Sequence, residues 1–267
     1  WLSVVRCAIE HPSMLEANAR KNVPITADPR GWVVLDERLG AALAAPGDEA
    51  GSVLATLQLA NGETGVVQNV TRFVEVCRAH RPDAFVHTDA VQAAGRIAVD
   101  FKALGVDALT LSSHKLGGPQ GVGALILREG VALEPLIRGG GQERGRRAGT
   151  ENVAAIAGFG AAAVAAVRQL ERVAESTRGW QRQIEAGVRH IAPLARIIGE
   201  SVPRLPNTSC IAVPGMSAET LVIALDLEGI AVSAGSACSS GKVTQSPVLS
   251  AMGLPPTIAG SAIRAST

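Results

Sequence analysis

Neither sign of charge is in excess in this sequence. Its 267 residues include 25 Lys and Arg and 24 Asp and Glu, which gives a net charge of +1. This balance provides no broad basic surface for nucleic acid or for an anionic membrane. Long apolar runs are missing too, since the longest, Val153 to Val167, is shorter than the roughly 18–20 residues of a membrane span. We therefore expect no nucleic-acid partner and no membrane partner.

Cysteine is scarce. Cys7, Cys77, Cys210 and Cys238 are scattered, and no two of them form a CxxC pair. This spacing argues against zinc and thioredoxin-like sites, and a disulfide framework is unexpected in a chain of this length. No signal-peptide pattern follows Trp1. We expect a protein of the reducing cytoplasm that binds no metal.

Apolar segments alternate with helical patterns through the first part of the chain. Several apolar segments are continuous, as in strands of a parallel sheet that is covered on both faces. Apolar positions three and four apart predict helices over Asp36–Ala45 and Asn69–His80. The sequence therefore predicts an α/β layered domain. Its strands are expected at Leu2–Ile9, Val53–Leu59, Ala84–His87, Ala108–Leu111 and Ala124–Leu127.

The pattern changes after Gly149. An Ala-rich helical region from Glu151 to about Ile191 is followed by short strand-like and helical pieces. We expect a large domain over residues 1–170 and a smaller α+β domain over residues 171–267. Because the sequence opens and closes inside apparent strands, we expect a chain that lacks its N-terminal segment. The pieces of the second domain are predicted at Arg196–Gly199, Thr208–Val213, Ser217–Glu228 and Ala231–Ser233.

Lys115 stands between an apolar run that ends at Leu111 and a glycine-rich turn. A lysine at the exit of a strand, with small polar neighbours and little room for water, can be kept neutral and nucleophilic. Such an amine can hold a carbonyl cofactor as a Schiff base. The alternative is a surface lysine in a turn.

Asp89 favours the cofactor over the surface lysine. It also ends an apolar run, and Gln92 follows three positions later. A buried carboxylate keeps a pyridine nitrogen protonated, so that the ring can act as an electron sink. Lys115 and Asp89 together therefore indicate a site for a carbonyl cofactor with a pyridine ring.

Cys238 is the second reactive candidate. Its segment, Ser233 to Lys242, holds no aromatic side chain and, up to Lys242, no aliphatic one larger than alanine. A structural cysteine usually lies among large apolar residues, as Cys77 does beside Val74 and Val76. A loop of Ser, Gly and Ala instead suits a thiolate nucleophile that moves between two partners. The alternative is an incidental loop cysteine.

In chain order, these segments resemble the cysteine desulfurases, which are pyridoxal-phosphate (PLP) enzymes of the class V aminotransferase fold. The resemblance is to the branch that supplies sulfur for iron–sulfur clusters, and it spans nearly the whole chain. It implies an α/β fold of the PLP-dependent transferase (aspartate aminotransferase-like) type and a homodimer. It rests on Glu10-His11-Pro12, Asn61 to Gln68, His87 to Gln92, Ser112 to Lys115, Gly139 to Arg144, Arg147 to Thr150, the Cys238 loop and Ile263-Arg264.

The resemblance implies that five residues hold the cofactor. Lys115 would bind it covalently and later move the substrate α-proton. Asp89 would pair with the pyridine nitrogen, and Gln92 would donate to the phenolic oxygen. Ser112 and His114 would reach the phosphate group.

Further roles are implied for residues outside this group. His11 would lie against the cofactor ring, although a histidine before Pro12 also suits the start of a helix. Thr150 would contact the phosphate from the second subunit of the dimer, or it is the N-cap of the long helical region. Arg264 would bind the substrate carboxylate, a task suited to a bidentate guanidinium, or it is a solvated charge.

The sequence departs from the family pattern at two places. Gly62 stands where the family commonly has a second asparagine, so Asn61 must make any polar contact to cofactor or substrate there. The family also has an N-terminal Gly/Thr-rich loop that binds much of the cofactor phosphate, and nothing in this sequence matches it. We expect these residues alone to hold PLP weakly or not at all.

The resemblance implies a cysteine desulfurase that converts L-cysteine to L-alanine, with a persulfide on Cys238 that passes to a sulfur-acceptor or scaffold protein. One alternative is a selenocysteine lyase or an aminotransferase of the same fold. An aminotransferase has no use for Cys238. The other alternative is a non-catalytic partner protein that retains the fold, which the missing phosphate loop and Gly62 favour.

Overall fold

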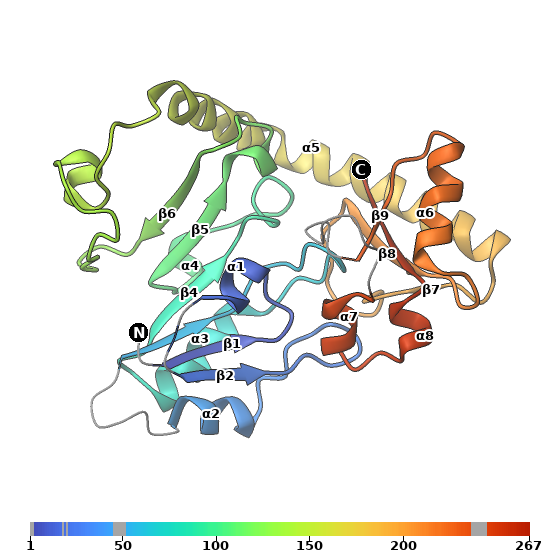
Figure 1. Ribbon diagram of the computed structural model, residues 1–267, viewed down its shortest axis with the longest axis horizontal. Coiled ribbons are helices and arrows are strands. Elements are labelled where there is room, and N and C mark those ends of the chain that lie inside the picture. Colours follow the sequence, from blue (N-terminus) through green and yellow to red (C-terminus); the bar gives the residue numbers. More distant parts are fainter. Residues whose placement is uncertain (1–2, 18, 20, 45–51, 236–244) are drawn as a thin grey trace.

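The computed structural model describes residues 3–17, 19, 21–44, 52–235 and 245–267. The described chain contains two sheets joined by one long helix (Figure 1). The larger sheet has the strand order β2-β1-β3-β4-β5-β6, in which the first five strands are parallel and β6 is antiparallel to β5. Its strands are β1 (Ser3–Cys7), β2 (Lys21–Ile25), β3 (Val53–Thr56), β4 (Phe85–Asp89), β5 (Ala108–Ser112) and β6 (Gly123–Leu127).

The mostly parallel sheet confirms the predicted fold class. Continuous apolar runs became buried strands, as in β1, where every residue is buried. The strand β2 was not predicted, because it has exposed residues and contains Pro24. Pro24 lies in an edge strand, which is where a sheet tolerates a residue without an N–H.

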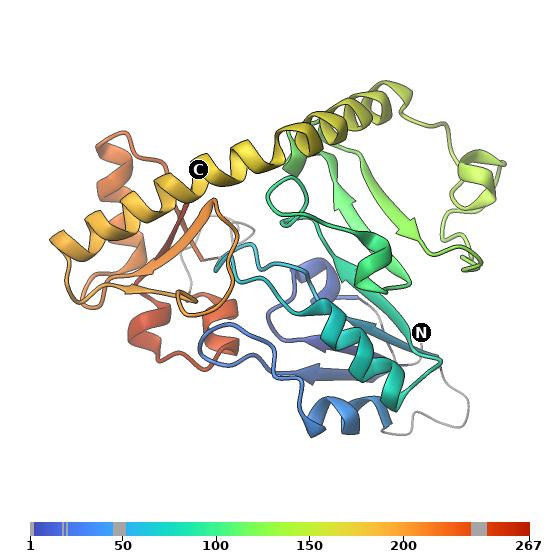
Figure 2. The ribbon, with the colours of Figure 1, turned by 180° about the vertical axis from the view of Figure 1, so that it is seen from behind.

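Helices accompany the larger sheet, and α3 crosses one of its faces (Figure 2). Asn69 caps α3 by accepting from the Arg72 N–H at 3.0 Å. The helix buries Phe73 and Cys77 in the core, as the spacing of its apolar residues predicts. The elements are α1 (Pro12–Leu15), α2 (Glu37–Ala44), α3 (Val70–His80), α4 (Phe101–Leu104) and the 3₁₀ segments η1 (Ser113–Leu116) and η2 (Gln142–Gly145).

The smaller sheet is antiparallel, with the order β7-β8-β10-β9. Its own core contains Ile197, Ile211, Ala218 and Ile263. The predicted strand and helix pieces of this region are confirmed, with bounds that differ by a few residues. The elements are β7 (Arg196–Ile197), β8 (Thr208–Ala212), α6 (Ala218–Leu227), β9 (Ser233–Ala234), α7 (Pro247–Ala251), α8 (Pro256–Ala259) and β10 (Ala262–Ser266).

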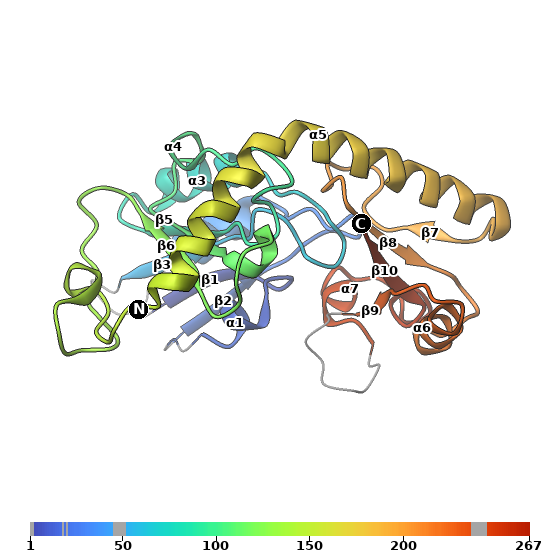
Figure 3. The same ribbon diagram turned by 90° about the horizontal axis from the view of Figure 1, so that it is seen from above.

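The helix α5 (Val153–Ile191) runs from the larger sheet to the smaller one (Figures 1 and 3). The expected domain boundary after residue 170 falls within this helix. Over its most apolar 18 residues α5 has a mean hydropathy of 1.6, and 11% of this stretch is buried, whereas we expected no segment long and apolar enough for a membrane span. By length and composition alone, α5 could cross a membrane.

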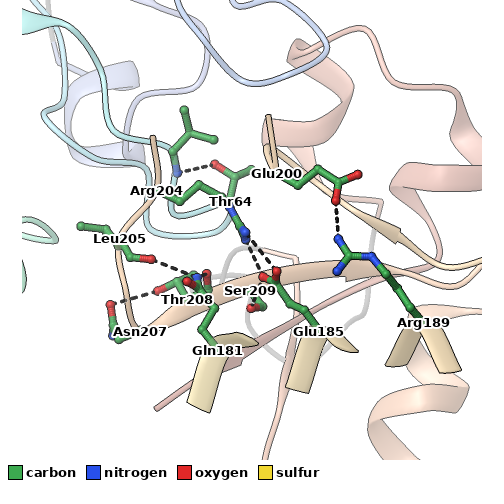
Figure 4. Close-up of polar contacts among 11 residues, drawn as sticks. Thr64, Gln181, Glu185, Arg189, Glu200, Arg204, Leu205, Asn207, Thr208 and Ser209 are labelled. Atoms are coloured by element: carbon green, nitrogen blue, oxygen red, sulfur yellow. Dashed lines mark hydrogen bonds and ion pairs between the residues drawn. The ribbon is translucent and has the colours of Figure 1, made fainter. Parts of the chain in front are cut away.

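The second half of α5 is bound to the smaller sheet by polar side chains (Figure 4). The Glu185 carboxylate accepts hydrogen bonds from Arg204 Nη1 at 2.7 Å and Nη2 at 3.1 Å, and from the Ser209 hydroxyl at 2.7 Å. Gln181 Nε2 donates to the carbonyl oxygens of Leu205 at 3.0 Å and Thr208 at 2.6 Å. These contacts show that α5 is an integral part of the fold.

Candidate active site

A cavity of about 510 Å³ lies at the carboxyl ends of β1, β3, β4 and β5. Parallel strands bring their carboxyl ends to one edge of a sheet, which is where ligands bind in α/β folds. Every predicted site residue that the structure describes, except Thr150, lines this cavity. These residues are His11, Asn61, Asp89, Gln92, Ser112, His114, Lys115 and Arg264.

Lys115 enters the cavity from η1, directly after β5. The turn ends at Gly117, whose φ of 81° is one that glycine adopts without strain. Lys115 also borders a second cavity of about 340 Å³, between η1 and α5, which Arg96 lines as well. No carboxylate among the described residues makes an ion pair with Lys115. Its amine is therefore available to a ligand.

Asp89 ends β4 and lines the cavity. Its Oδ1 accepts from the Val91 N–H at 2.8 Å. Burial raises the pKa of Asp89, while the Val91 N–H and the nearby His11 oppose the rise. A carboxylate with this environment is stabilised by a cation placed against it, such as a protonated ring nitrogen.

His11 is both the start of a helix and part of the cavity wall. It is the N-cap of α1, and its Nδ1 accepts from the Ser13 N–H at 3.2 Å and lies 2.8 Å from the Ser13 hydroxyl. The two interpretations of this residue are therefore compatible, because the cap uses only one ring nitrogen and His11 also lines the cavity.

Ser112 and His114 form a polar pair at the end of β5. The Ser112 hydroxyl lies 2.8 Å from His114 Nδ1. The two side chains flank Lys115 in the chain and line the same cavity. A hydroxyl and an imidazole N–H in this position can donate hydrogen bonds to an anion.

Asn61 is buried and its side chain is already used within the protein. Its Oδ1 accepts from the N–H groups of Glu63 and Thr64, each at 2.9 Å, and its Nδ2 donates to Ile9 O at 3.1 Å. These bonds fix the turn after β3 against the end of β1. One Nδ2 hydrogen remains for a ligand, so Asn61 can make a single polar contact there.

Gly62 allows two predicted site residues to approach the backbone. A Cβ at this position would lie 3.1 Å from Gln92 Nε2, which is closer than ordinary contact. The Gly62 carbonyl also accepts from Arg264 Nη1 at 2.9 Å. The absence of a side chain therefore leaves room for Gln92 at the place where the family commonly has asparagine.

Arg264 reaches the cavity from β10 in the smaller sheet. Its Nη2 donates to Ser233 Oγ at 3.2 Å, and its Nε is buried without a hydrogen-bond partner among the described residues. The alternative of a solvated charge is therefore wrong, because the guanidinium is half-buried and bonded. An arginine held this way, with a donor still unused, can bind a carboxylate.

Two acidic residues of the cavity wall were not assigned a role from the sequence. Glu10 and Glu63 are 1% and 4% exposed. Burial raises the pKa of Glu63, while the Ser246 hydroxyl and Arg264 oppose the rise. Glu10 follows the mainly apolar stretch Leu2–Ile9, much as Asp89 comes shortly after the stretch Ala84–His87. That position could have identified Glu10 as a candidate.

One described site residue, Thr150, lies away from the cavity. Thr150 is exposed in the loop before α5 and does not line the cavity. Its alternative role as the helix cap is wrong, because Asn152 Oδ1 caps α5 by accepting from the Ala155 N–H at 3.1 Å. Cys238 lies outside the described residues. The described chain before it ends at Gly235, next to β9, whose Ser233 contacts Arg264.

The remaining cysteines are buried thiols. Burial raises the pKa of Cys7 and Cys77 to about 12, and it raises that of Cys210 further. A thiol with so high a pKa is a poor nucleophile at neutral pH. Within the described ranges there is no group of three or more His, Cys, Asp or Glu side chains that could hold a metal ion.

The fold and the site define a PLP-dependent transferase of the aspartate aminotransferase type. Its lysine, Lys115, follows β5, and its carboxylate, Asp89, ends the neighbouring strand β4. The sequence matches the Aminotransferase class-V family over residues 39–267. The chain belongs to this family.

Curated relatives and solved structures agree with the family. A cysteine desulfurase from Cereibacter sphaeroides is 47% identical over 211 residues, which cover 79% of this chain and 53% of that protein. One from Sinorhizobium fredii is 38% identical, covering 98% of this chain and 67% of that protein. A NifS-like protein from Rickettsia africae has a TM-score of 0.89 and 36% identity, covering 99% of this chain and 70% of that chain. The chain thus spans about half to two thirds of the length of the curated relatives it matches.

The family depends on PLP, and the cavity suits this group. The space of about 510 Å³ contains an unpaired lysine amine, a half-buried carboxyl group and a hydroxyl–imidazole pair. These are the groups that an aldehyde, a pyridine nitrogen and a phosphate require. Lys115, Asp89, Gln92, Ser112 and His114 are thus the residues that would hold it.

Proposed function

We propose that the complete protein is a PLP-dependent cysteine desulfurase, which converts L-cysteine to L-alanine and leaves the sulfur as a persulfide on Cys238. One observation supports this proposal most strongly. Lys115, Asp89 and Arg264 come from distant parts of the chain and line one cavity. The names of the relatives point to the same activity.

Each residue contributes a step that its chemistry allows. When bound, PLP withdraws electrons from the substrate α-carbon. Lys115 holds the cofactor and, once displaced, removes the α-proton. Arg264 binds the substrate carboxylate. The Cys238 thiolate attacks the substrate sulfur, the bond from that sulfur to carbon breaks, and the electron pair stays with the carbon skeleton that becomes alanine.

We also propose the setting in which this reaction takes place. The protein acts as a homodimer in the cytoplasm, with a large domain over residues 1–170 and a small domain over residues 171–267. Thr150 contacts the phosphate of the partner subunit, and an acceptor or scaffold protein takes the sulfur for iron–sulfur clusters. The loop that carries Thr150 also exposes Leu136 by 97% and Ile137 by 56%, which supports a protein contact there.

The first test is PLP binding by the full-length protein. Wild-type protein should develop the absorbance of an imine with PLP and release alanine from L-cysteine. Lys115→Ala should lose both. Lys102→Ala is the matched control, because Lys102 is exposed on α4 and should leave both unchanged. An imine band in Lys115→Ala equal to that of wild type would overturn the role of this lysine.

The alternatives give different results in the same assay. A non-catalytic partner protein would show no imine band although circular dichroism shows an intact fold. Cys238→Ala should keep the band and lose alanine release from cysteine. Alanine release by Cys238→Ala at the wild-type rate would instead contradict the persulfide step. Faster release from selenocysteine than from cysteine would favour a selenocysteine lyase.

A further inference from the structure

Glu10 is a buried carboxyl group in the wall of the cavity, at the end of β1. It is 1% exposed. Its Oε1 accepts from the Gln58 N–H at 2.6 Å, which is the only hydrogen bond to this side chain among the described residues. Its Oε2 is buried and unpaired. An ionised carboxylate with two oxygens out of water requires more donors than this, so the geometry favours the protonated form.

The net effect of the surroundings of Glu10 also favours its protonated form. Burial raises the pKa of Glu10 to about 8, the Gln58 N–H opposes this rise, Asp89 adds to it and Arg6 opposes it. Cys7 on the same strand has a pKa of about 12 because of burial, so it is neutral near pH 7. Asp89 on β4 is thus the acidic neighbour that, when ionised, repels a charge on Glu10.

Asp89 and Glu10 each accept one backbone N–H, but Asp89 is half-buried whereas Glu10 is fully buried. Asp89 accepts from the Val91 N–H and is also stabilised by the charge of His11. Glu10 has only the Gln58 N–H and the more weakly acting Arg6. Two carboxyl groups that repel each other share protons unequally, and the proton stays with the more deeply buried group, which is Glu10.

We propose that Glu10 holds the single proton of this pair, so that Asp89 alone is ionised toward the cavity. Glu10 is then a positioning residue that acts through Asp89. This inference rests on the proposed function, because the group that meets Asp89 is the cofactor ring. It predicts a protonated glutamic acid in the native protein at neutral pH, and a coupling between its titration and the charge of Asp89.

The test is an infrared titration of the full-length protein, before and after loading with PLP. The carbonyl stretch of a protonated carboxyl group should disappear with a midpoint near pH 8 before loading. Glu10→Gln keeps the acceptor for the Gln58 N–H, and the difference spectrum between wild type and this variant should contain the Glu10 band, while a band from the other buried carboxyl group, Glu63, should be present in both proteins. Glu75→Gln, exposed on α3, is the control that should keep the Glu10 band.

The decisive variant leaves Glu10 in place. In Asp89→Asn the same band should remain, and its midpoint should move to lower pH because the repelling charge is gone. A midpoint that does not change in Asp89→Asn would overturn the inference, as would a Glu10 band that titrates near the ordinary glutamate range. Alanine release from L-cysteine by the wild-type sample tests the proposed function separately.

Discussion

The ion pair of Glu185 and Arg204 gives a sharp test of how α5 is bound to the smaller sheet. The side chains are 8% and 11% exposed, and the guanidinium binds both carboxylate oxygens. Glu185→Gln keeps the shape of the side chain but leaves Arg204 as an uncompensated buried charge. Breaking a buried pair on one side costs about 3–5 kcal/mol. We expect Glu185→Gln to lower the free energy of unfolding by about 3 kcal/mol.

Urea denaturation followed by circular dichroism measures this change. The control is Glu200→Gln, which removes an exposed pair with Arg189 on the same side of α5 (Figure 4). Exposed pairs contribute about 0–1 kcal/mol. The double replacement Glu185→Leu with Arg204→Met should recover most of the loss, since neither charge is then left alone. A loss for Glu185→Gln no larger than that of the control would refute the reasoning.

The same pair sets a dependence on pH. Burial raises the pKa of Glu185, but the hydrogen bonds from Arg204 and Ser209 outweigh it, so the pKa lies below its ordinary value. The unfolded chain therefore takes up this proton at a higher pH than the folded chain does. The stability that Glu185 contributes is present above the unfolded pKa and is lost as pH falls through the folded one. The difference in stability between wild type and Glu185→Gln should shrink in acid.

Two further predictions concern stability of the larger sheet and its turns. Asp107→Asn should lower the free energy of unfolding by about 2–3 kcal/mol, as measured by urea denaturation. Asp107 is buried and makes an ion pair with Arg78 at 2.6 Å, which the substitution removes. Gly199→Ala should be more destabilising than Gly215→Ala in thermal unfolding. Both have positive φ, but a Cβ on Gly199 would lie 2.5 Å from Val66 Cγ2, whereas one on Gly215 meets nothing within 4 Å. Equal losses would contradict the close approach at Gly199.

Sequence patterns predicted five strands of the larger sheet and the helix α3. Continuous apolar runs identified β1, β3, β4 and β5, and the spacing in α3 placed its apolar face toward the core. The strand β2 could not be predicted, because an edge strand needs no apolar run and Pro24 reads against a strand. Local sequence patterns indicate which residues are buried. The edge strand β2 is mostly exposed, and its pairing with β1 stabilises it instead.

The cavity was predictable only where polar residues follow apolar runs. Lys115 and Asp89 both stand at such positions, and parallel strands bring them to one edge. The contact between Arg264 and Gly62 joins residues 202 positions apart. A local pattern of apolar and polar residues gives no information on contacts so far apart in the sequence, so the half-buried state of Arg264 follows only from the tertiary fold. The protonation of Glu10 is of the same kind, since it depends on neighbours from other strands.

The continuity of α5 has a consequence for how the molecule melts. The single helix α5 packs against the regions of both sheets. If one of these regions unfolds, part of the helix that the other region packs against becomes exposed. On heating, the two regions should therefore unfold in one cooperative transition, and calorimetry should show a single endotherm.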